Sequence, residues 1–310
     1  DQWRTQLAEF LDLESERIGM IGAGKRQPTG FIDIAIIQSL RRKGRVDNLV
    51  GNYGQVIIDE CHHISANSFE QVARKCHAKY VIGLSATVTR KDGHHPIIFM
   101  QCGPTRYLVT ARQGAATHPF SHQVIFNETG FIMPKRFEDR EPTIHEIYEA
   151  LFRDDTRNHR IFEDVVKSIA EEKRSPLLIS ERREHVDMFA ERFLPFIKNV
   201  LVFRGGMGRK QRQALNEQLK GVSDNEERLL IATGRYLGEG FDDARLDTLF
   251  LALPVSWRGT LAQYAGRLHR LHYNKKEVRI YDYTDSEVPL LEKMYKRRLR
   301  GYRSIGYSTS

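Results

Sequence analysis

The sequence predicts an α/β protein of two domains, each built on a mainly parallel sheet flanked by helices. Short β-branched apolar runs alternate with segments of helical periodicity in both halves, which is the pattern of parallel sheets. The 310 residues are enough for two domains of ordinary size. Between the halves, a charged stretch is bracketed by Pro134 and Pro142, which is typical of a linker. We expect a first domain at 1–134, a linker at 135–157 and a second domain at 158–310.

The overall composition narrows the class of partner. The chain is 40% hydrophobic and 28% charged, which is typical of a globular protein, and it contains no apolar run long enough to span a membrane. The net charge of +8 favours a polyanionic partner, nucleic acid before a membrane surface. The three cysteines form neither a C-x-x-C pair nor an even set. We therefore expect free thiols in a reducing compartment, the cytoplasm.

The first half begins with an amphipathic helix, because Trp3, Leu7, Phe10 and Leu11 fall on one helical face. The pattern then predicts strands at 18–21 and 31–36, a helix or turn opening at Gln38, a strand at 56–58, a helix at 65–76 and a strand at 80–84. The basic residues that follow Gln38 have two interpretations. They form either a solvated loop or a set of phosphate contacts.

Residues 19–25 match the phosphate-loop spacing G-x-x-x-x-G-K, but their context does not fit. Arg26 stands where a Ser or Thr would bind Mg²⁺. A phosphate loop opens a helix whose N-terminal amides hold the anion, whereas Pro28 and Gly30 follow here and disfavour a helix. We interpret this segment as a coincidental match.

The chain is organised around Val56-Ile57-Ile58-Asp59-Glu60, an apolar run that ends in two carboxylates. Such a run predicts a buried parallel strand, and ligands bind at the C-terminal ends of such strands. One carboxylate there can hold Mg²⁺ and the next can orient or deprotonate a water. Ser85 and Thr87 follow the next predicted parallel strand, so we expect them at the same sheet edge.

The second half repeats the alternation. Strands are predicted at 177–180, 200–203, 229–233, 248–253 and 278–281, with helical stripes at 161–169 and 186–193 and an amphipathic basic helix near the C-terminus. A glycine-rich turn follows Arg204, and it is either a tight turn or a phosphate contact.

A helix at 261–270 carries the sharpest pattern. Leu261, Tyr264, Ala265 and Leu268 form its packing face, and Gln263, Arg267 and Arg270 lie near the opposite side. Two arginines so placed form either a solvated face or a clamp on a γ-phosphate, where an arginine finger is worth ~10³–10⁵ in rate.

Four segments resemble, in order and spacing, the motifs of superfamily 2 helicases. Asp59-Glu60-Cys61-His62 resembles the DExH box, Ser85-Ala86-Thr87 resembles motif III, residues 232–242 resemble motif V, and residues 263–270 resemble motif VI. The resemblance covers most of the chain. It is greatest to the XPB-like and UvsW-like group and the motors of type I and III restriction enzymes, DNA translocases with two RecA-like domains.

The resemblance implies that ATP and Mg²⁺ bind in a cleft between the domains. Asp59 would hold Mg²⁺, and Glu60 would activate the attacking water. Residues that resemble the coupling motifs would link hydrolysis to the nucleic-acid strand: His62, Ser85 and Thr87. Residues of motifs V and VI would complete the nucleotide site: Arg267 and Arg270 at the γ-phosphate, Gln263 supporting them, and Gly240 and Asp242 near the nucleotide.

The same resemblance implies a nucleic-acid partner, DNA in single- or double-stranded form, or RNA, and no membrane. The residues that would touch its backbone are Gln38, Arg41, Arg42, Arg204 and Thr233. Contacts to phosphate and sugar make binding independent of sequence and sensitive to salt.

One part of the family pattern is missing. The phosphate loop (Walker A) precedes motif Ia, and the segment from Asp1 to Trp3 resembles motif Ia itself. We therefore expect the first domain to be N-terminally incomplete, with a sheet that lacks central strands and exposes an edge. We also expect residues 1–310 alone to bind ATP poorly and hydrolyse it slowly.

Three functions remain open: a DNA helicase or translocase, an RNA helicase, and a nucleic-acid-binding or scaffolding module without turnover. The presence of Asp59, Glu60, Arg267 and Arg270 favours an enzyme, since a scaffold has no need of all four. The missing phosphate loop favours a scaffold.

Overall fold

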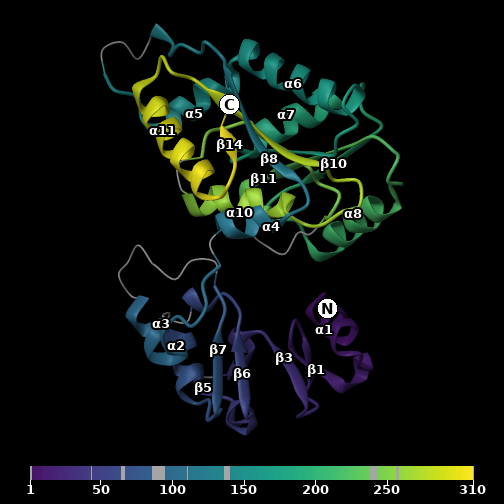
Figure 1. Cartoon of the computed structure of the whole chain (residues 1–310), viewed down its shortest axis with the longest axis vertical. Helices are drawn as coiled ribbons and strands as arrows, with labels where there is room; N and C mark the ends of the chain where they lie inside the picture. The colour runs from purple at the N-terminus through teal and green to yellow at the C-terminus, as the bar shows by residue number, and fades with distance from the viewer. Residues whose placement is uncertain are drawn as a thin grey trace. The chain divides into compact units, whose positions relative to one another are not determined.

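The computed structural model describes residues 2–42, 44–63, 67–85, 95–109, 111–135, 140–237, 243–255 and 258–309. The chain divides into two compact units, Asp1–Leu108 and Val109–Ser310, which are described separately (Figure 1). Both units mix helices with parallel strand pairs, which confirms the predicted α/β class. Among the described residues, no helix has both the length and the apolar character needed to cross a membrane.

In the part of it that is described, unit 1 consists of short strands, three α-helices and four short 3-10 helices. Its elements are α1 (Gln2–Leu11), β1 (Ile18–Gly22), β2 (Lys25–Gln27), β3 (Ile32–Ala35), β4 (Arg41–Arg42), β5 (Arg45–Val46), β6 (Gln55–Ile58), α2 (Asn67–Arg74), β7 (Tyr80–Gly83) and α3 (His95–Cys102). The strands form three small sheets, of order β2-β1-β3, β4-β5 and β6-β7. The predicted strands at 18–21, 31–36, 56–58 and 80–84 are all present.

The segment with phosphate-loop spacing is a β-hairpin. β1 pairs antiparallel with β2, and the two are joined by Ala23 and Gly24, whose φ angles are 51° and 83°. Positive φ at both central residues is the requirement of a tight hairpin turn. No helix follows this loop, because Lys25 is itself the first residue of β2. The interpretation of residues 19–25 as a coincidental match is therefore confirmed.

β6 and β7 pair in parallel, and the described residues form an apolar cluster on one face of this pair. Ile58 packs with residues of α2 and α3 in a small apolar cluster. On the other face, Ile57 is 57% exposed and Ile82, its register partner, is 43% exposed. The prediction of a strand buried on both faces is therefore wrong for β6. The two-stranded sheet instead has the exposed apolar surface expected of a sheet without further strands.

Unit 2 is built on one seven-stranded sheet of order β10-β11-β9-β12-β13-β8-β14, with every neighbouring pair parallel. Its strands are β8 (Ser121–Glu128), β9 (Pro176–Ser180), β10 (Asn199–Phe203), β11 (Arg228–Thr233), β12 (Thr248–Leu251), β13 (Glu277–Thr284) and β14 (Ser308–Thr309). Its helices are α4 (Ala111–Thr117), α5 (Ile144–Arg153), α6 (Asp155–Ala170), α7 (Arg183–Phe193), α8 (Arg209–Gly221), α9 (Gly234–Leu237), α10 (Arg258–Leu268) and α11 (Pro289–Ser304).

Helices cover both faces of this sheet, as Figure 1 shows. Along β11, Leu229 and Ile231 pack with α6 and α7, while Leu230 and Ala232 pack with α10. This alternation follows the two-residue period of a strand, and it leaves all of β11 buried. The core of unit 2 therefore lies in two layers, one on each side of the central strands.

The predicted domain boundary needs correction. Residues 121–128 form β8, which pairs along its whole length with β13, so they belong to the second unit and not to a first domain ending at 134. The predicted linker at 135–157 also contains structure. Within it lies α5, which begins with a capping box formed by Thr143 and Glu146 and buries Ile147 in a satellite core. Residues 136–139 lie outside the described part of the chain.

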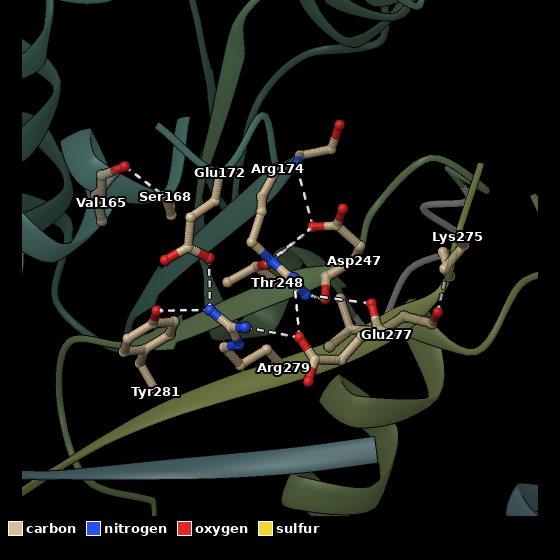
Figure 2. A network of polar contacts seen from close by, with 12 residues as sticks. Val165, Ser168, Glu172, Arg174, Asp247, Thr248, Lys275, Glu277, Arg279 and Tyr281 are labelled. Carbon is tan, nitrogen blue, oxygen red and sulfur yellow. Dashed lines mark hydrogen bonds and ion pairs between the residues drawn. The ribbon is translucent and has the colours of Figure 1, made fainter. Parts of the chain in front are cut away.

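A network of charged residues ties the N-terminal ends of three strands together (Figure 2). Arg174, just before β9, donates to the Glu277 carboxylate at 3.1 Å and to the Asp247 carbonyl at 3.2 Å. Arg279 donates to the same Glu277 carboxylate at 2.7 Å. These groups lie where β9, β12 and β13 begin, so this network does not extend to the opposite, C-terminal edge of the sheet.

A buried histidine makes the stability of unit 2 depend on pH. His185 is fully buried, with Nε2 3.0 Å from Asn158 Oδ1 and Nδ1 3.1 Å from Ser180 Oγ. Since the amide oxygen only accepts, Nε2 carries a hydrogen. Burial, followed by the charges of Arg157 and Arg182, lowers the pKa of His185 to about 3.

We predict that unit 2 loses stability as the pH falls from about 6.5 towards 3. In this window the unfolded imidazole binds a proton that the folded one does not, which costs ~1.4 kcal/mol per pH unit. The free energy of unfolding, measured with urea, should fall between pH 7 and pH 5. This fall should be about 2 kcal/mol smaller in His185→Gln than in the unsubstituted protein. His145→Gln, at an exposed position, is the control. An equal drop in all three proteins would contradict this role of His185.

Candidate functional site

The two carboxylates predicted to be functional lie at the C-terminal end of β6. Asp59 and Glu60 are both exposed, and the Asp59 Oδ1 accepts a hydrogen bond from the Glu60 amide at 2.9 Å. Glu60 has a φ of 49°, in the left-handed region that a side chain other than glycine rarely adopts. Immediately after it, the Cys61 amide donates to the Leu84 carbonyl at 2.9 Å. The turn carrying the acidic pair is thus held against the end of β7.

His62 connects this acidic turn with the residue that follows β7. Its Nδ1 lies 3.1 Å from Glu60 Oε2 and 3.0 Å from Ser85 Oγ. Since a carboxylate only accepts, the contact with Glu60 places the hydrogen on Nδ1. The structure therefore brings together Glu60, His62 and Ser85, as the sequence predicted for the edge of the first sheet. Thr87 lies outside the described residues.

Two thiols lie beneath the acidic turn. A Cβ added to Gly83 would stand 3.0 Å from Cys61 Sγ and 2.9 Å from Cys102 Sγ, so a larger residue does not fit here without a shift. Burial raises the pKa of Cys61, and it raises the pKa of Cys102 to about 11. Both groups remain thiols at neutral pH, and they pack as small apolar groups below the site.

Asp59 fits a Mg²⁺ ion by the chemistry of its donor atoms. Mg²⁺ prefers oxygen ligands and is usually held by one or two carboxylates while it keeps several waters. The exposed carboxylate of Asp59 supplies such an oxygen and leaves room for those waters.

In unit 2, α10 has the packing face that was predicted. Leu261, Tyr264, Ala265 and Leu268 are buried, while Gln263 is exposed and Arg267 is half-buried. The helix ends at Leu268, so the prediction that Arg270 lies on the helix is wrong.

The turn that carries Arg270 is fixed by a lysine. Lys275 Nζ donates to the carbonyls of Leu268 at 2.8 Å and of Arg270 at 2.7 Å. A cation at a helix C-terminus satisfies carbonyls that have no partner within the helix and is favoured by the helix dipole. Arg270 therefore projects from a held turn and is itself exposed.

The C-terminal end of β11 also contacts α10 closely. Tyr264 Oη donates to Glu181 Oε1 at 2.6 Å, directly above Gly234. A Cβ on Gly234 would overlap both the Tyr264 hydroxyl and the Glu181 carboxylate. Glycine at this position is what allows α10 to approach the sheet edge.

Arg204 and Thr233 come together at the ends of β10 and β11. The Gly205 amide donates to Thr233 Oγ1 at 2.8 Å, which links the two turns. The guanidinium of Arg204 is already engaged, because its Nε donates to Asp187 Oδ1 on α7 at 2.6 Å. Asp187 was not predicted to be part of this site. The pair is 17 residues apart and has no local pattern.

The remaining predicted nucleic-acid residues lie on unit 1. Gln38 and Arg41 are exposed, and Arg41 and Arg42 form β4, which pairs with β5 in a short hairpin. Gly240 and Asp242, predicted near the nucleotide, lie outside the described residues.

A cavity of about 830 Å³ opens near the C-terminal end of β9, at the same edge of the sheet. Its lining is charged and polar, and it comes from α5, from the segment before α5 and from the segment after β9: Arg140, His145, Glu146, Tyr148, Glu149, Glu181 and Arg182. None of these residues was predicted to belong to the site. The only signal was the polar pair Glu181-Arg182 directly after an apolar strand.

Comparisons with known proteins agree with this architecture. Residues 1–90 match the family described as "Type III restriction enzyme, res subunit". A protein of Acanthamoeba polyphaga mimivirus is 23% identical to this chain over 277 residues. Its name assigns it provisionally to the ATP-dependent RNA helicases, and the match covers 89% of this chain and 51% of the mimivirus protein. The DNA 3'-5' helicase XPB of Kineococcus radiotolerans is 32% identical over 112 residues, or 34% of this chain and 20% of that protein.

Solved structures support the fold. S. cerevisiae Dbp5 bound to RNA and ADP BeF3 is similar with a TM-score of 0.64 at 10% identity, covering all of this chain and 74% of that one. The chain spans about half the length of the mimivirus protein. Together with the motifs at Asp59–His62 and Gln263–Arg270, these matches support the similarity of the chain to superfamily 2 helicases and translocases, in the group of XPB and the restriction enzymes.

Proposed function

We propose that the protein is an ATP-driven DNA helicase or translocase. The observation that carries this proposal is the acidic turn after β6, in which Glu60 contacts His62 and His62 contacts Ser85. A general base needs a fixed position, and this turn is held by hydrogen bonds on both sides. The match of residues 1–90 to a restriction-enzyme motor family supports the choice of DNA.

In this proposal the acidic turn prepares the hydrolytic water. The Glu60 carboxylate accepts a hydrogen bond from the water and takes its proton during attack on the γ-phosphate. Asp59 would hold Mg²⁺, which neutralises charge on the phosphates when bound. His62 keeps Glu60 in place and, through Ser85, connects the acidic turn to the segment after β7. Together with Thr87, these residues couple hydrolysis to movement of the nucleic-acid strand.

Unit 2 supplies cations for the same reaction. Arg267 and Arg270 stabilise the charge that develops on the γ-phosphoryl group, and Gln263 supports them. Support comes from the held turn after α10, since Lys275 fixes the backbone on which Arg270 stands. Gly240 and Asp242 complete the nucleotide contacts in this proposal.

The nucleic-acid backbone would contact both units. Gln38, Arg41 and Arg42 contribute from unit 1, and Arg204 and Thr233 contribute from the C-terminal edge of the larger sheet. Such contacts to phosphate carry no sequence information. The net charge of +8 is consistent with a polyanionic partner.

We predict that Glu60→Gln abolishes hydrolysis while leaving ATP-dependent binding to DNA. The amide keeps the shape of the side chain but cannot take a proton, and loss of a positioned base typically costs ~10²–10⁴ in rate. DNA-stimulated ATPase and filter binding should be measured on the product of the complete reading frame. Glu163→Gln, at an exposed position on α6, is the matched control and should leave both unchanged. Turnover of Glu60→Gln at the control rate would overturn the role of Glu60.

We predict that Arg204 makes a phosphate contact whose strength Asp187 limits. The logarithm of the nucleic-acid binding constant falls linearly with log[salt]. Arg204→Gln should reduce the magnitude of this slope by ~0.7–0.9, the value of one phosphate contact. Asp187→Asn removes the competing carboxylate and should tighten binding. Arg153→Gln, which breaks a similar pair with Glu149 on α5, is the control. An unchanged salt slope in Arg204→Gln would exclude this contact.

An RNA helicase is the second candidate, favoured by the name of the mimivirus relative. The two functions separate in one ATPase assay. Stimulation by poly-dT and by duplex DNA, with none by poly-U, supports the DNA motor. Stimulation by poly-U alone supports the RNA helicase. No stimulation of the ATPase by poly-dT, duplex DNA or poly-U, with nucleic-acid binding retained, would indicate a module without turnover.

A further inference from the structure

Three histidines from separate segments of unit 2 converge on one point. His118 follows α4, His122 lies on β8, and His269 follows α10. Each offers a ring nitrogen, and these three atoms all lie within 4.8 Å of one another. His122 is 7% exposed and the other two rings are half-buried. The cluster takes no part in the proposed reaction.

The spacing of two of these nitrogens matches that of metal ligands. His118 Nδ1 lies 3.3 Å from His122 Nε2. With metal–nitrogen bonds of about 2.0–2.1 Å and tetrahedral angles, two ligand nitrogens stand about 3.3–3.4 Å apart. A hydrogen bond from a ring N–H is usually shorter, at about 2.7–3.2 Å to its acceptor. The pair is therefore already at ligand distance before any ion is added.

The third ring has an outer partner of the kind found at metal sites. His269 Nε2 lies 3.0 Å from the hydroxyl of Tyr307, which is 3% exposed. When Nε2–H donates to that oxygen, the lone pair of Nδ1 is free for a cation. Ligating histidines usually donate their other ring nitrogen to a nearby acceptor, which fixes tautomer and orientation. Phe120 also orients His118, with ring centroids 4.9 Å apart and an interplanar angle of 17°.

We propose that His118, His122 and His269 bind one divalent transition-metal ion of the zinc class, with a fourth position left for water or another donor. Neutral imidazole is the preferred nitrogen ligand of such ions. Burial lowers the pKa of His122 to about 4 and that of His269 to about 3, so both rings are neutral at pH 7.

The proposed site has a structural consequence. His269 stands between Arg267 and Arg270, so an ion would tie the arginine turn to β8 and to the end of α4. A bound metal adds a cross-link between segments far apart in the chain and stabilises the state that binds it.

One nearby charge opposes the ion. The ammonium of Lys275 lies 5.5 Å from the centre of the Phe120 ring, and its charge further lowers the pKa of His118 and of His269. We therefore expect binding weaker than that of sites with cysteine ligands. His122 lies on β8, and His269 lies in the turn that carries Arg270. His118 lies in neither, so its replacement disturbs the sheet and the arginines least.

The test is equilibrium dialysis of the full 310-residue chain, without a histidine tag and stripped with a chelator, against Zn²⁺ at pH 7.5. We expect one ion per chain, at least tenfold weaker binding in His118→Ala and in His118→Gln, and unchanged binding in His145→Ala. Co²⁺ should give the visible absorption of a four-coordinate site, lost in the same two variants. Absence of bound Zn²⁺, or binding in both His118 variants as strong as in the unsubstituted chain, would overturn the proposal.

Discussion

Parallel pairing of strands determines where the chemistry of both units can be placed. In unit 1, β6 and β7 run side by side in register, so the residues that follow them leave the sheet at one edge. That constraint is what allows His62, after β6, to reach Ser85, after β7. In unit 2, the same constraint brings Arg204 and Thr233 into adjacent turns. Residues distant in the sequence become neighbours because their strands end together.

Packing then decides how rigidly each group is presented. In unit 2 the central strands are buried on both faces, and α10 is held by its apolar side and by the contact of Tyr264 with Glu181 above Gly234. Lys275 also fixes the turn that carries Arg270, because its ammonium donates to the Arg270 carbonyl. In unit 1 the described residues form an apolar cluster on one face of the β6–β7 pair. The acidic turn depends more on local hydrogen bonds, with Glu60 in a left-handed conformation.

Much of this could be predicted from the sequence because it depends on local patterns. Strand positions follow from apolar runs, the rejection of a phosphate loop at residues 19–25 from the residues after it, and the buried face of α10 from its helical period. The site residues came from motifs at fixed spacing. The structure describes most of them, but Thr87, Gly240 and Asp242 lie outside it.

The features that sequence reasoning missed depend on long-range contacts. Only the pairing of β8 with β13 assigns residues 121–128 to the second unit. Asp187 meets Arg204 through the approach of α7 to the end of β10. The cluster of His118, His122 and His269 joins segments separated by about half the chain. None of these contacts leaves a periodic signal.

The central claim is that the acidic turn of unit 1 and the arginines of unit 2 act on the same phosphoryl transfer. A double-mutant cycle with Glu60→Gln and Arg267→Ala, followed by single-turnover ATP hydrolysis on DNA, tests it most directly. Groups that act as a unit are grossly non-additive. We predict that the double variant is no slower than the slower single variant. Rate losses that multiply in the double variant would contradict the account.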